Sequence, residues 1–252
     1  MSACAKRKWQ RCALARRGNG SDERLREEET AAVSARERGL WLDNAAHRDD
    51  LATFVDRALR LDDAAVIRFR ERTGTGKVVA WVSTGFDVLA CRVVDGRVRP
   101  TDLSAGADTL SRTLPAMDAT GFVEPGFAMD SAWRGVLPPD TGFAHYDDVP
   151  AWAILDLAER GTALAKEHSS AHGPPASLLD QEVLAVSEGE SSVGIPMRCV
   201  FALTAMGFLP PNADVLASDE IVRVRAHPAW LRIDARFGSV YRRLGDPALV
   251  LR

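Results

Sequence analysis

The most apolar stretch of the chain, VGIPMRCVFALTAMGFL at residues 193–209, constrains the fold more than any other. Arg198 is its only charged residue, so apolar side chains would cover nearly the whole circumference of a helix. A helix of this kind either lies in a protein core or spans a membrane. Spanning requires about 20 apolar residues, whereas this run is shorter and contains Pro196. We therefore predict a buried core helix.

Residues that bound helices lie at both ends of this run. Ser191 and Ser192 offer side chains that cap a helix N-terminus, and a proline fits only in the first turn, where its missing N–H costs nothing. At the other end, Gly207 suits the left-handed conformation that commonly stops a helix. We expect the C-terminal half of the chain to be built around this helix.

Toward the N-terminus, the pattern predicts one helix and then an antiparallel meander. Leu51, Phe54, Val55 and Ala58 recur at the three- and four-residue spacing of a single helix face. Four strand-like segments separated by glycine-containing turns follow, at 65–70, 77–83, 87–94 and 97–100. The Asp95-Gly96 pair is typical of the last hairpin turn.

Downstream, the pattern predicts helices around the buried helix and a C-terminal β-hairpin. One helix should begin at Asp147 and Asp148, and a second should cover 177–186. After the buried helix, apolar residues alternate with arginines over 220–226 and 230–235, as in two paired strands. The fold class predicted from these elements is α+β.

The chain divides into four parts. Residues 1–40 carry a basic block and then an acidic one, and we expect a disordered or loosely helical tail there. The N-terminal helix and meander occupy 41–117, a long covering loop occupies 118–147, and the helical unit with its hairpin occupies 148–252. Whether the two structured halves share one core stays open at this point.

Composition and missing motifs exclude several classes of function. The net charge of -3 argues against a general nucleic-acid or membrane binder. The motifs GxSxG and HExxH and a glycine-rich dinucleotide turn are absent. The four cysteines show no paired metal spacing. With no secretory segment after the basic N-terminus, we expect a cytoplasmic protein. We also expect no cofactor.

The long loop and the segment after it hold the candidates for an enzyme site. A carboxylate beside a histidine can set its tautomer and raise its pKa, as acid–base catalysis requires. His145, Asp147 and Arg134 are therefore candidate catalytic residues. The structural alternative, which we favour, is that Asp147 and Asp148 cap a helix. Trp133 and Arg134 are also candidates to clamp a planar or anionic ligand.

Two histidines have the spacing of a metal site. His168 and His172 lie four residues apart, which places both imidazoles on one helix face. No third ligand follows at a suitable spacing. Because histidines near a helix C-terminus are also favoured by the helix dipole, we expect no metal.

Residues 176–243 have the element order of a winged helix, two helices and then a hairpin. Arg223, Arg225 and Arg232 would then contact phosphates from the wing. A recognition helix, however, must present polar and basic side chains, and the apolar helix in that place has only Arg198. A nucleic-acid interface is an alternative rather than the favoured function.

The segments PMRCVFALTAMGFLP and AWLRIDARFGSVYRR, with PPDTGF upstream, resemble uncharacterised conserved proteins of high-GC actinobacteria over residues 137–243. The resemblance implies a cytoplasmic bacterial protein and no particular activity. Because catalytic motifs are missing and the long loop is rich in apolar residues, we expect a non-catalytic protein-interaction or regulatory module. Its partner would be another protein or a second copy of the chain, and not a membrane.

Overall fold

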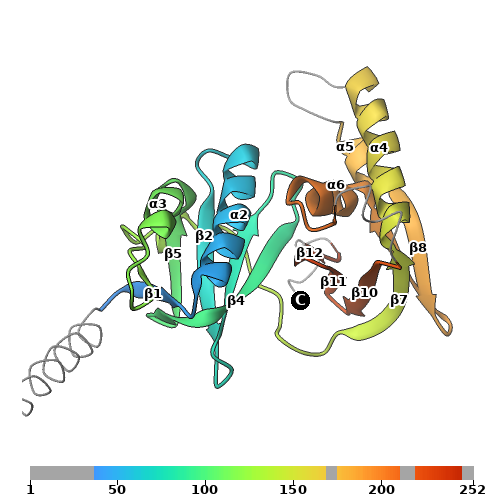
Figure 1. Ribbon diagram of the computed structural model, residues 1–252. Coiled ribbons are helices and arrows are strands. Elements are labelled where there is room, and N and C mark those ends of the chain that lie inside the picture. The colour runs from blue at the N-terminus through green and yellow to red at the C-terminus, as the bar shows by residue number, and fades with distance from the viewer. Residues whose placement is uncertain (1–36, 169–174, 211–218, 246–252) are drawn as a thin grey trace, which may run out of the picture.

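The computed structural model describes residues 37–168, 175–210 and 219–245. Most of the predicted tail at 1–40 lies outside these residues. In the part of the chain that the structure describes, strands join into a long antiparallel sheet with helices along one face (Figure 1). The predicted α+β class is confirmed.

The N-terminal half supplies β1 (Gly39–Leu42), α2 (Ala45–Leu61), β2 (Val66–Arg72), β3 (Lys77–Ser83), β4 (Leu89–Arg99), β5 (Asp102–Gly106), α3 (Ala107–Thr113), η1 (Leu114–Ala116), β6 (Phe122–Val123) and η2 (Asp130–Ala132). The C-terminal half supplies β7 (Ala144–Pro150), α4 (Ala151–His168), α5 (Ala176–Asp180), β8 (Glu182–Glu188), β9 (Ser191–Pro196), α6 (Met197–Ala205), β10 (Ile221–His227), β11 (Trp230–Ala235) and β12 (Gly238–Arg243).

The main sheet runs in the order β5-β2-β3-β4-β12-β11-β10-β7. The short strand β1 pairs with β4 and with β6, and β8 and β9 form a separate hairpin. The two halves meet where β4 pairs with β12, with Cys91 opposite Ser239 and Leu89 opposite Tyr241. The sheet therefore continues from one half of the chain into the other.

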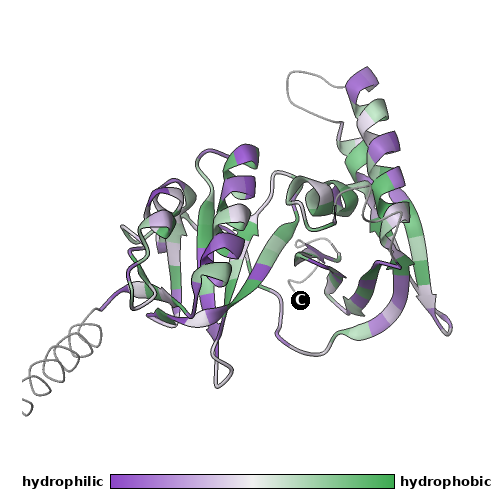
Figure 2. Cartoon of the chain, viewed as in Figure 1, coloured by the Kyte–Doolittle hydropathy of each residue, from purple (hydrophilic) through white to green (hydrophobic). Residues whose placement is uncertain are grey.

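The predicted N-terminal helix is present as α2. The Asn44 side chain caps it by accepting hydrogen bonds from the backbone N–H groups of Ala46 and His47, at 2.9 and 3.1 Å. The predicted apolar face, which includes Leu51 and Phe54, is buried. Figure 2 shows hydrophilic and hydrophobic residues alternating along α2 and α4, as expected for helices with one face in the core.

The predicted meander is also present, but its last turn is not. Strands β2, β3 and β4 pair in sequence order. The Asp95-Gly96 pair does not turn the chain, because β4 continues through it to Arg99. Instead, Gly96 lies opposite Leu42 of β1 at a φ of 156°, and a Cβ there would overlap the carbonyl oxygen of Trp41. The glycine serves a close approach between strands rather than a turn.

The apolar run at 193–209 is buried as predicted, but only its middle is a helix. Its first residues belong to β9, and α6 begins after Pro196. Every residue from Met197 to Leu203 is buried. The predicted stop is confirmed: Gly207 has a φ of 65°, and the Phe208 N–H bonds to the Leu203 carbonyl at 2.9 Å. Pro196 could not lie in a helix interior, and it is instead the last residue of β9.

Two other helix predictions were wrong. The segment 177–186 is helical only to Asp180, and its remainder forms β8, which pairs with β9. Asp147 and Asp148 do not begin a helix, because both lie in β7 and α4 starts at Ala151. In each case a short apolar or acidic segment fits both periods. Strand pairing decided the outcome, of β8 with the adjacent β9 and of β7 with the distant β10.

The sheet separates two apolar clusters. The larger one joins α2, α3, α4 and α6 to the helix-covered face of the sheet, with residues of both halves in contact, such as Phe54 and Phe208, whose rings stack at 6.3 Å. On the helix-free face, Val79, Trp81, Leu89, Cys91, Trp230 and Tyr241 form a smaller cluster. Trp133, Leu137 and Phe143, from the segment that leads into β7, pack over this smaller cluster.

Truncating the buried helix tests its role as the centre of the C-terminal half. Phe201 is 7% exposed and its ring lies 6.0 Å from that of Phe86. We expect Phe201→Ala to lower the free energy of unfolding by about 3–5 kcal/mol in urea denaturation. Phe127→Ala removes a ring that is 92% exposed and should change it by about 0.5 kcal/mol or less. Equal effects would show that α6 is not core.

Adding a single carbon tests the contact between the halves. A Cβ on Gly238 would lie 2.5 Å from the Phe208 ring and 2.8 Å from the Cys91 carbonyl oxygen. We expect Gly238→Ala to destabilise the protein by about 1–3 kcal/mol, as overpacking does. Gly85→Ala is the matched control, because its Cβ would meet nothing within 4 Å. A neutral Gly238→Ala in the same thermal denaturation assay would refute this close packing.

Candidate functional site

The candidate catalytic residues of β7 form a surface ion-pair group. His145 Nε2 lies 3.0 Å from Asp148 Oδ1, and Arg223 Nε donates to the same oxygen at 3.0 Å. Asp147 Oδ1 accepts the backbone N–H of Asp148 at 2.8 Å. His145 and Asp148 are 49% and 38% exposed. The partners of these groups are therefore each other, on an open strand surface, and not a substrate in a cavity.

The three arginines considered for nucleic acid lie together, and each of them pairs with a carboxylate. Arg225 and Arg232 face each other across β10 and β11, and both pair with Asp234. Arg223 pairs with Asp148. Arg232 also lies over the Tyr241 ring at 5.4 Å. Two carboxylates therefore offset two of the three positive charges of this surface, and none of the three guanidinium groups is free of an ion pair.

The candidate metal pair cannot be placed, because His172 and the His168 side chain lie outside the described residues. Within residues 37–168, 175–210 and 219–245, no group of three or more His, Cys, Asp or Glu side chains is arranged to hold a metal ion. The buried cysteines Cys91 and Cys199 are both free thiols. Burial raises the pKa of each thiol to about 12, so both stay protonated at neutral pH.

Trp133 and Arg134 separate rather than forming a clamp. The Trp133 indole N–H donates to the Gly135 carbonyl at 3.0 Å, and the guanidinium of Arg68 lies 5.8 Å from the ring centre. Trp133 therefore anchors the segment between β6 and β7, residues 124–143, which we call the connector. Arg134 is exposed and lines a pocket.

That pocket, which we call the junction pocket, has a volume of about 300 Å³ and opens on the helix-free face where the halves meet. Four parts of the chain build it: the turn between β3 and β4 with the start of β4, the connector, the start of β11, and the end of β12 with the residues after it. Leu89, Val136, Trp230 and Tyr241 are among its apolar lining residues. Burial raises the pKa of the Tyr241 hydroxyl above its usual range, so it remains neutral.

The charges of the junction pocket are mainly positive. Arg134 and Arg243 line it, and neither has a carboxylate partner among the described residues. Asp87 lies on its rim with a 96% exposed side chain, 3.7 Å from Arg198. Val136 is 64% exposed. The pocket thus combines an apolar floor with two guanidinium groups that can donate hydrogen bonds to a carboxylate.

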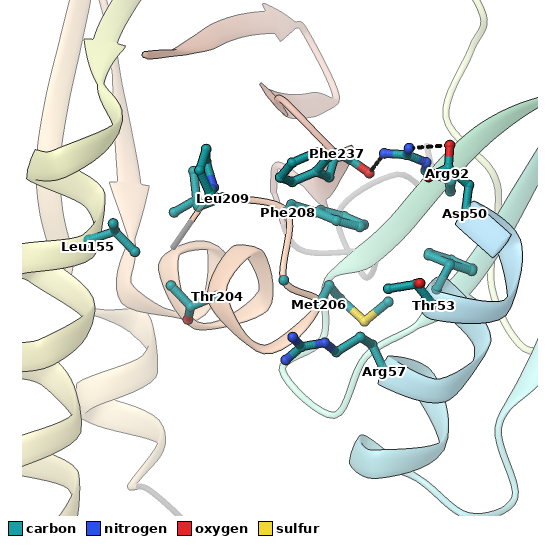
Figure 3. A pocket seen from close by; sticks show the side chains of 13 residues that line it. Asp50, Thr53, Arg57, Arg92, Leu155, Thr204, Met206, Phe208, Leu209 and Phe237 are labelled. Atoms are coloured by element: carbon teal, nitrogen blue, oxygen red, sulfur yellow. Dashed lines mark hydrogen bonds and ion pairs between the residues drawn. The ribbon is translucent and has the colours of Figure 1, made fainter. Parts of the chain in front are cut away.

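A second cavity, which we call the helix-side pocket, lies on the other face of the sheet. It has a volume of about 580 Å³ and is bounded by α2, β4, α4 and the turn after α6 (Figure 3). Phe54, Leu155, Met206 and Leu209 are among its apolar residues, and Arg57 enters it from α2. The two pockets therefore flank the same junction from opposite faces.

Sequence reasoning found Arg134 but missed the rest of both pockets. Arg243 and Tyr241 lie in β12, and nothing in the sequence joins that strand to β4. Arg57 lies in α2, and nothing in the pattern of that helix shows that it lines a pocket. The turn at Gly207 was predicted, but not that it would face α2. The missing signal is the strand pairing between the halves, which no local pattern reveals.

The pKa of Asp148 tests the surface group. It is lowered, first by the hydrogen bond with His145 and then by Arg223. These contacts therefore stabilise the protein above the ordinary carboxyl pKa and cease to do so as the pH falls through the lowered one. Arg223→Gln should raise the Asp148 pKa in an NMR titration. Arg236→Gln, which removes a guanidinium paired with Glu220, should not. An unchanged pKa in Arg223→Gln would contradict this pairing.

Two family models match the sequence, and both are described as domains of unknown function. One (DUF8010) matches residues 35–135 and the other (DUF8185) residues 138–247. The boundary between the matches falls in the connector. No curated protein matches the sequence. Among the described residues, no helix has the length and apolar character needed to cross a membrane.

Solved structures give a likeness of fold. A chain assigned as a DNA polymerase III beta subunit from Eubacterium rectale superposes with a TM-score of 0.51 at 10% identity, over 83% of this chain and 65% of that one. The DNA polymerase sliding clamp from Pseudomonas aeruginosa gives 0.48 at 11% identity, over 79% and 63%. The clamp from Caulobacter crescentus gives 0.48 at 12%, over 86% and 69%.

This chain spans less than two thirds of the length of the Eubacterium and Pseudomonas chains, at 65% and 63%. At 10% identity the Eubacterium likeness concerns the fold alone. The sequence therefore consists of two successive regions that match domains of unknown function, on a fold similar to that of a DNA polymerase III beta subunit.

Proposed function

We propose that the protein is a non-catalytic interaction module whose junction pocket receives a short segment of a partner protein. The observation that carries this proposal is the composition of the pocket, an apolar floor beside two guanidinium groups that pair with no carboxylate of the described residues. Both halves and the connector contribute to it, so the site exists only in the assembled fold. Solvent-exposed Val136 gives the rim the apolar contact expected at an interaction site.

The chemistry of the pocket defines the partner segment. An aliphatic or aromatic side chain would pack against Leu89 and Val136, and a carboxylate beside it would bond to Arg134 or Arg243. A bidentate carboxylate–guanidinium pair adds geometric specificity to the apolar contact. The expected partner is therefore an extended segment with an apolar residue next to an acidic one.

The enzyme alternative lacks support from the residues that suggested it. Acid–base catalysis requires His145 to reach a bound substrate, but its Nε2 lies 3.0 Å from the Asp148 carboxylate on an open strand. Arg134 lines the junction pocket without a histidine, a cysteine or a paired carboxylate that could act as base or nucleophile among the described lining residues.

The nucleic-acid alternative lacks the charge it needs. Binding to a phosphate backbone depends on unneutralised lysines and arginines. Arg223, Arg225 and Arg232 pair with Asp148 or Asp234 instead. The chain as a whole carries a net charge of -3. These observations favour a protein partner over a nucleic acid.

A phage-displayed dodecapeptide library selected on the full chain tests the proposal. We expect the selected peptides to carry an apolar residue beside Asp or Glu. In fluorescence anisotropy, the double substitution Arg134→Glu with Val136→Asp should weaken their binding by about tenfold or more, which corresponds to about 1.4 kcal/mol.

Phe127→Asp is the matched control, because Phe127 is an exposed connector residue that does not line the pocket. It should leave the affinity unchanged. Peptides that bind the double variant as tightly as the unaltered protein would place the interaction elsewhere, and a library that yields no binder would remove the proposal.

A further inference from the structure

The helix-side pocket is the larger of the two cavities described above, and the proposed interaction does not use it. Its volume of about 580 Å³ lies within the range typical of small-molecule sites. Apolar residues of both halves line it: Phe54 of α2, Leu155 of α4, and Met206 and Leu209 after α6. Of these, Met206 is 2% exposed, so the wall it forms is part of the packed core.

Most polar groups of this pocket already have partners inside the protein. Arg92 donates to Asp50 Oδ2 at 2.6 Å and to the carbonyl oxygen of Phe237, as drawn in Figure 3. The Thr53 hydroxyl donates to the Asp49 carbonyl at 2.9 Å, and the Thr204 hydroxyl to the Val200 carbonyl at 3.1 Å. These contacts hold the frame of the pocket and leave little for a ligand.

Arg57 is different. Its side chain is half-buried, extends from α2 past Met206 toward the turn after α6 (Figure 3), and makes no hydrogen bond or ion pair with another described residue. The guanidinium lies beside Gly207, where a Cβ added to that glycine would come within 3.1 Å of it. A partly desolvated guanidinium that has no carboxylate among the described residues is a site for an anion.

We propose that the helix-side pocket binds a small aliphatic carboxylate. The alkyl chain would lie against Phe54, Leu155, Met206 and Leu209, and the carboxylate would form a two-point ion pair with Arg57. A neutral apolar molecule would leave the guanidinium unpaired in the pocket, and a larger polar anion would leave the apolar wall unused. The ligand therefore needs both an apolar body and one negative end.

Such a ligand would contact both halves of the molecule. Arg57 and Phe54 belong to the N-terminal half, whereas Leu155, Met206 and Leu209 belong to the C-terminal half. Because it binds only the assembled junction, the ligand stabilises the folded protein by an amount that rises with the logarithm of its concentration once that exceeds the Kd. A rise of the thermal midpoint with ligand concentration is thus one readout of binding.

Isothermal titration of the full chain with hexanoate, octanoate and decanoate tests the proposal. Each added methylene should tighten binding about fourfold as it becomes buried. Arg57→Gln should weaken octanoate binding by about tenfold or more, as loss of a charged hydrogen bond does. Arg60→Gln is the matched control, since Arg60 is an exposed residue of the same helix that does not line the pocket.

Octanol tests the role of the carboxylate without any substitution, and it should bind at least about tenfold more weakly than octanoate. No saturable binding of decanoate, an affinity independent of chain length, or octanol bound as tightly as octanoate would each overturn the proposal. An Arg57→Gln variant that folds normally and keeps its affinity would do the same. The peptides selected on the junction pocket should bind undiminished in saturating decanoate, so the two proposals fail separately.

Discussion

The pairing of β4 with β12 is the interaction on which the rest of the structure depends. One edge of β4 pairs with β3 along most of its length, while the other edge pairs with β12 at Leu89–Cys91 and with β1 from Gly96 to Arg99. This divided edge joins the halves into one sheet. It also brings Phe208 against Phe54 on one face and Tyr241 against Trp81, 5.1 Å between ring centres, on the other. Both pockets lie beside this junction of β4 with β12, which we call the seam.

A buried arginine connects the core helix to that seam. Arg198 of α6 is 9% exposed, donates to the Phe86 carbonyl at 2.7 Å and pairs with Asp180 at 2.5 Å. The carbonyl belongs to the turn between β3 and β4, and the same turn supplies Asp87 and Val88 to the junction pocket. The one charge in the apolar run is therefore not an irregularity of the core. It holds the wall of a pocket in place from the opposite face of the sheet.

How much the sequence could predict depended on whether the deciding contacts were local. The helix at Leu51–Ala58 and the stop at Gly207 follow from periodicity and backbone conformation, so both were predicted correctly. The strands β8 and β9 were misread as helix, because short apolar runs fit either period and only their mutual pairing selects one. Arg134 was named because the connector had no period of its own. Its neighbour Arg243 was not, because their meeting requires the pairing of β4 with β12.

The distribution of charge supports the proposal that the ligand is not a phosphate backbone. Helices α2 and α3 carry equal numbers of basic and acidic residues, and α4 carries one more acid than base. Each of the three arginines of β10 and β11 pairs with Asp148 or Asp234. Arg57, Arg134 and Arg243, which have no carboxylate partner among the described residues, line the two pockets beside apolar walls. We propose that positive charges placed there favour a ligand that is both apolar and acidic, such as a protein segment or an aliphatic carboxylate, over a nucleic-acid backbone.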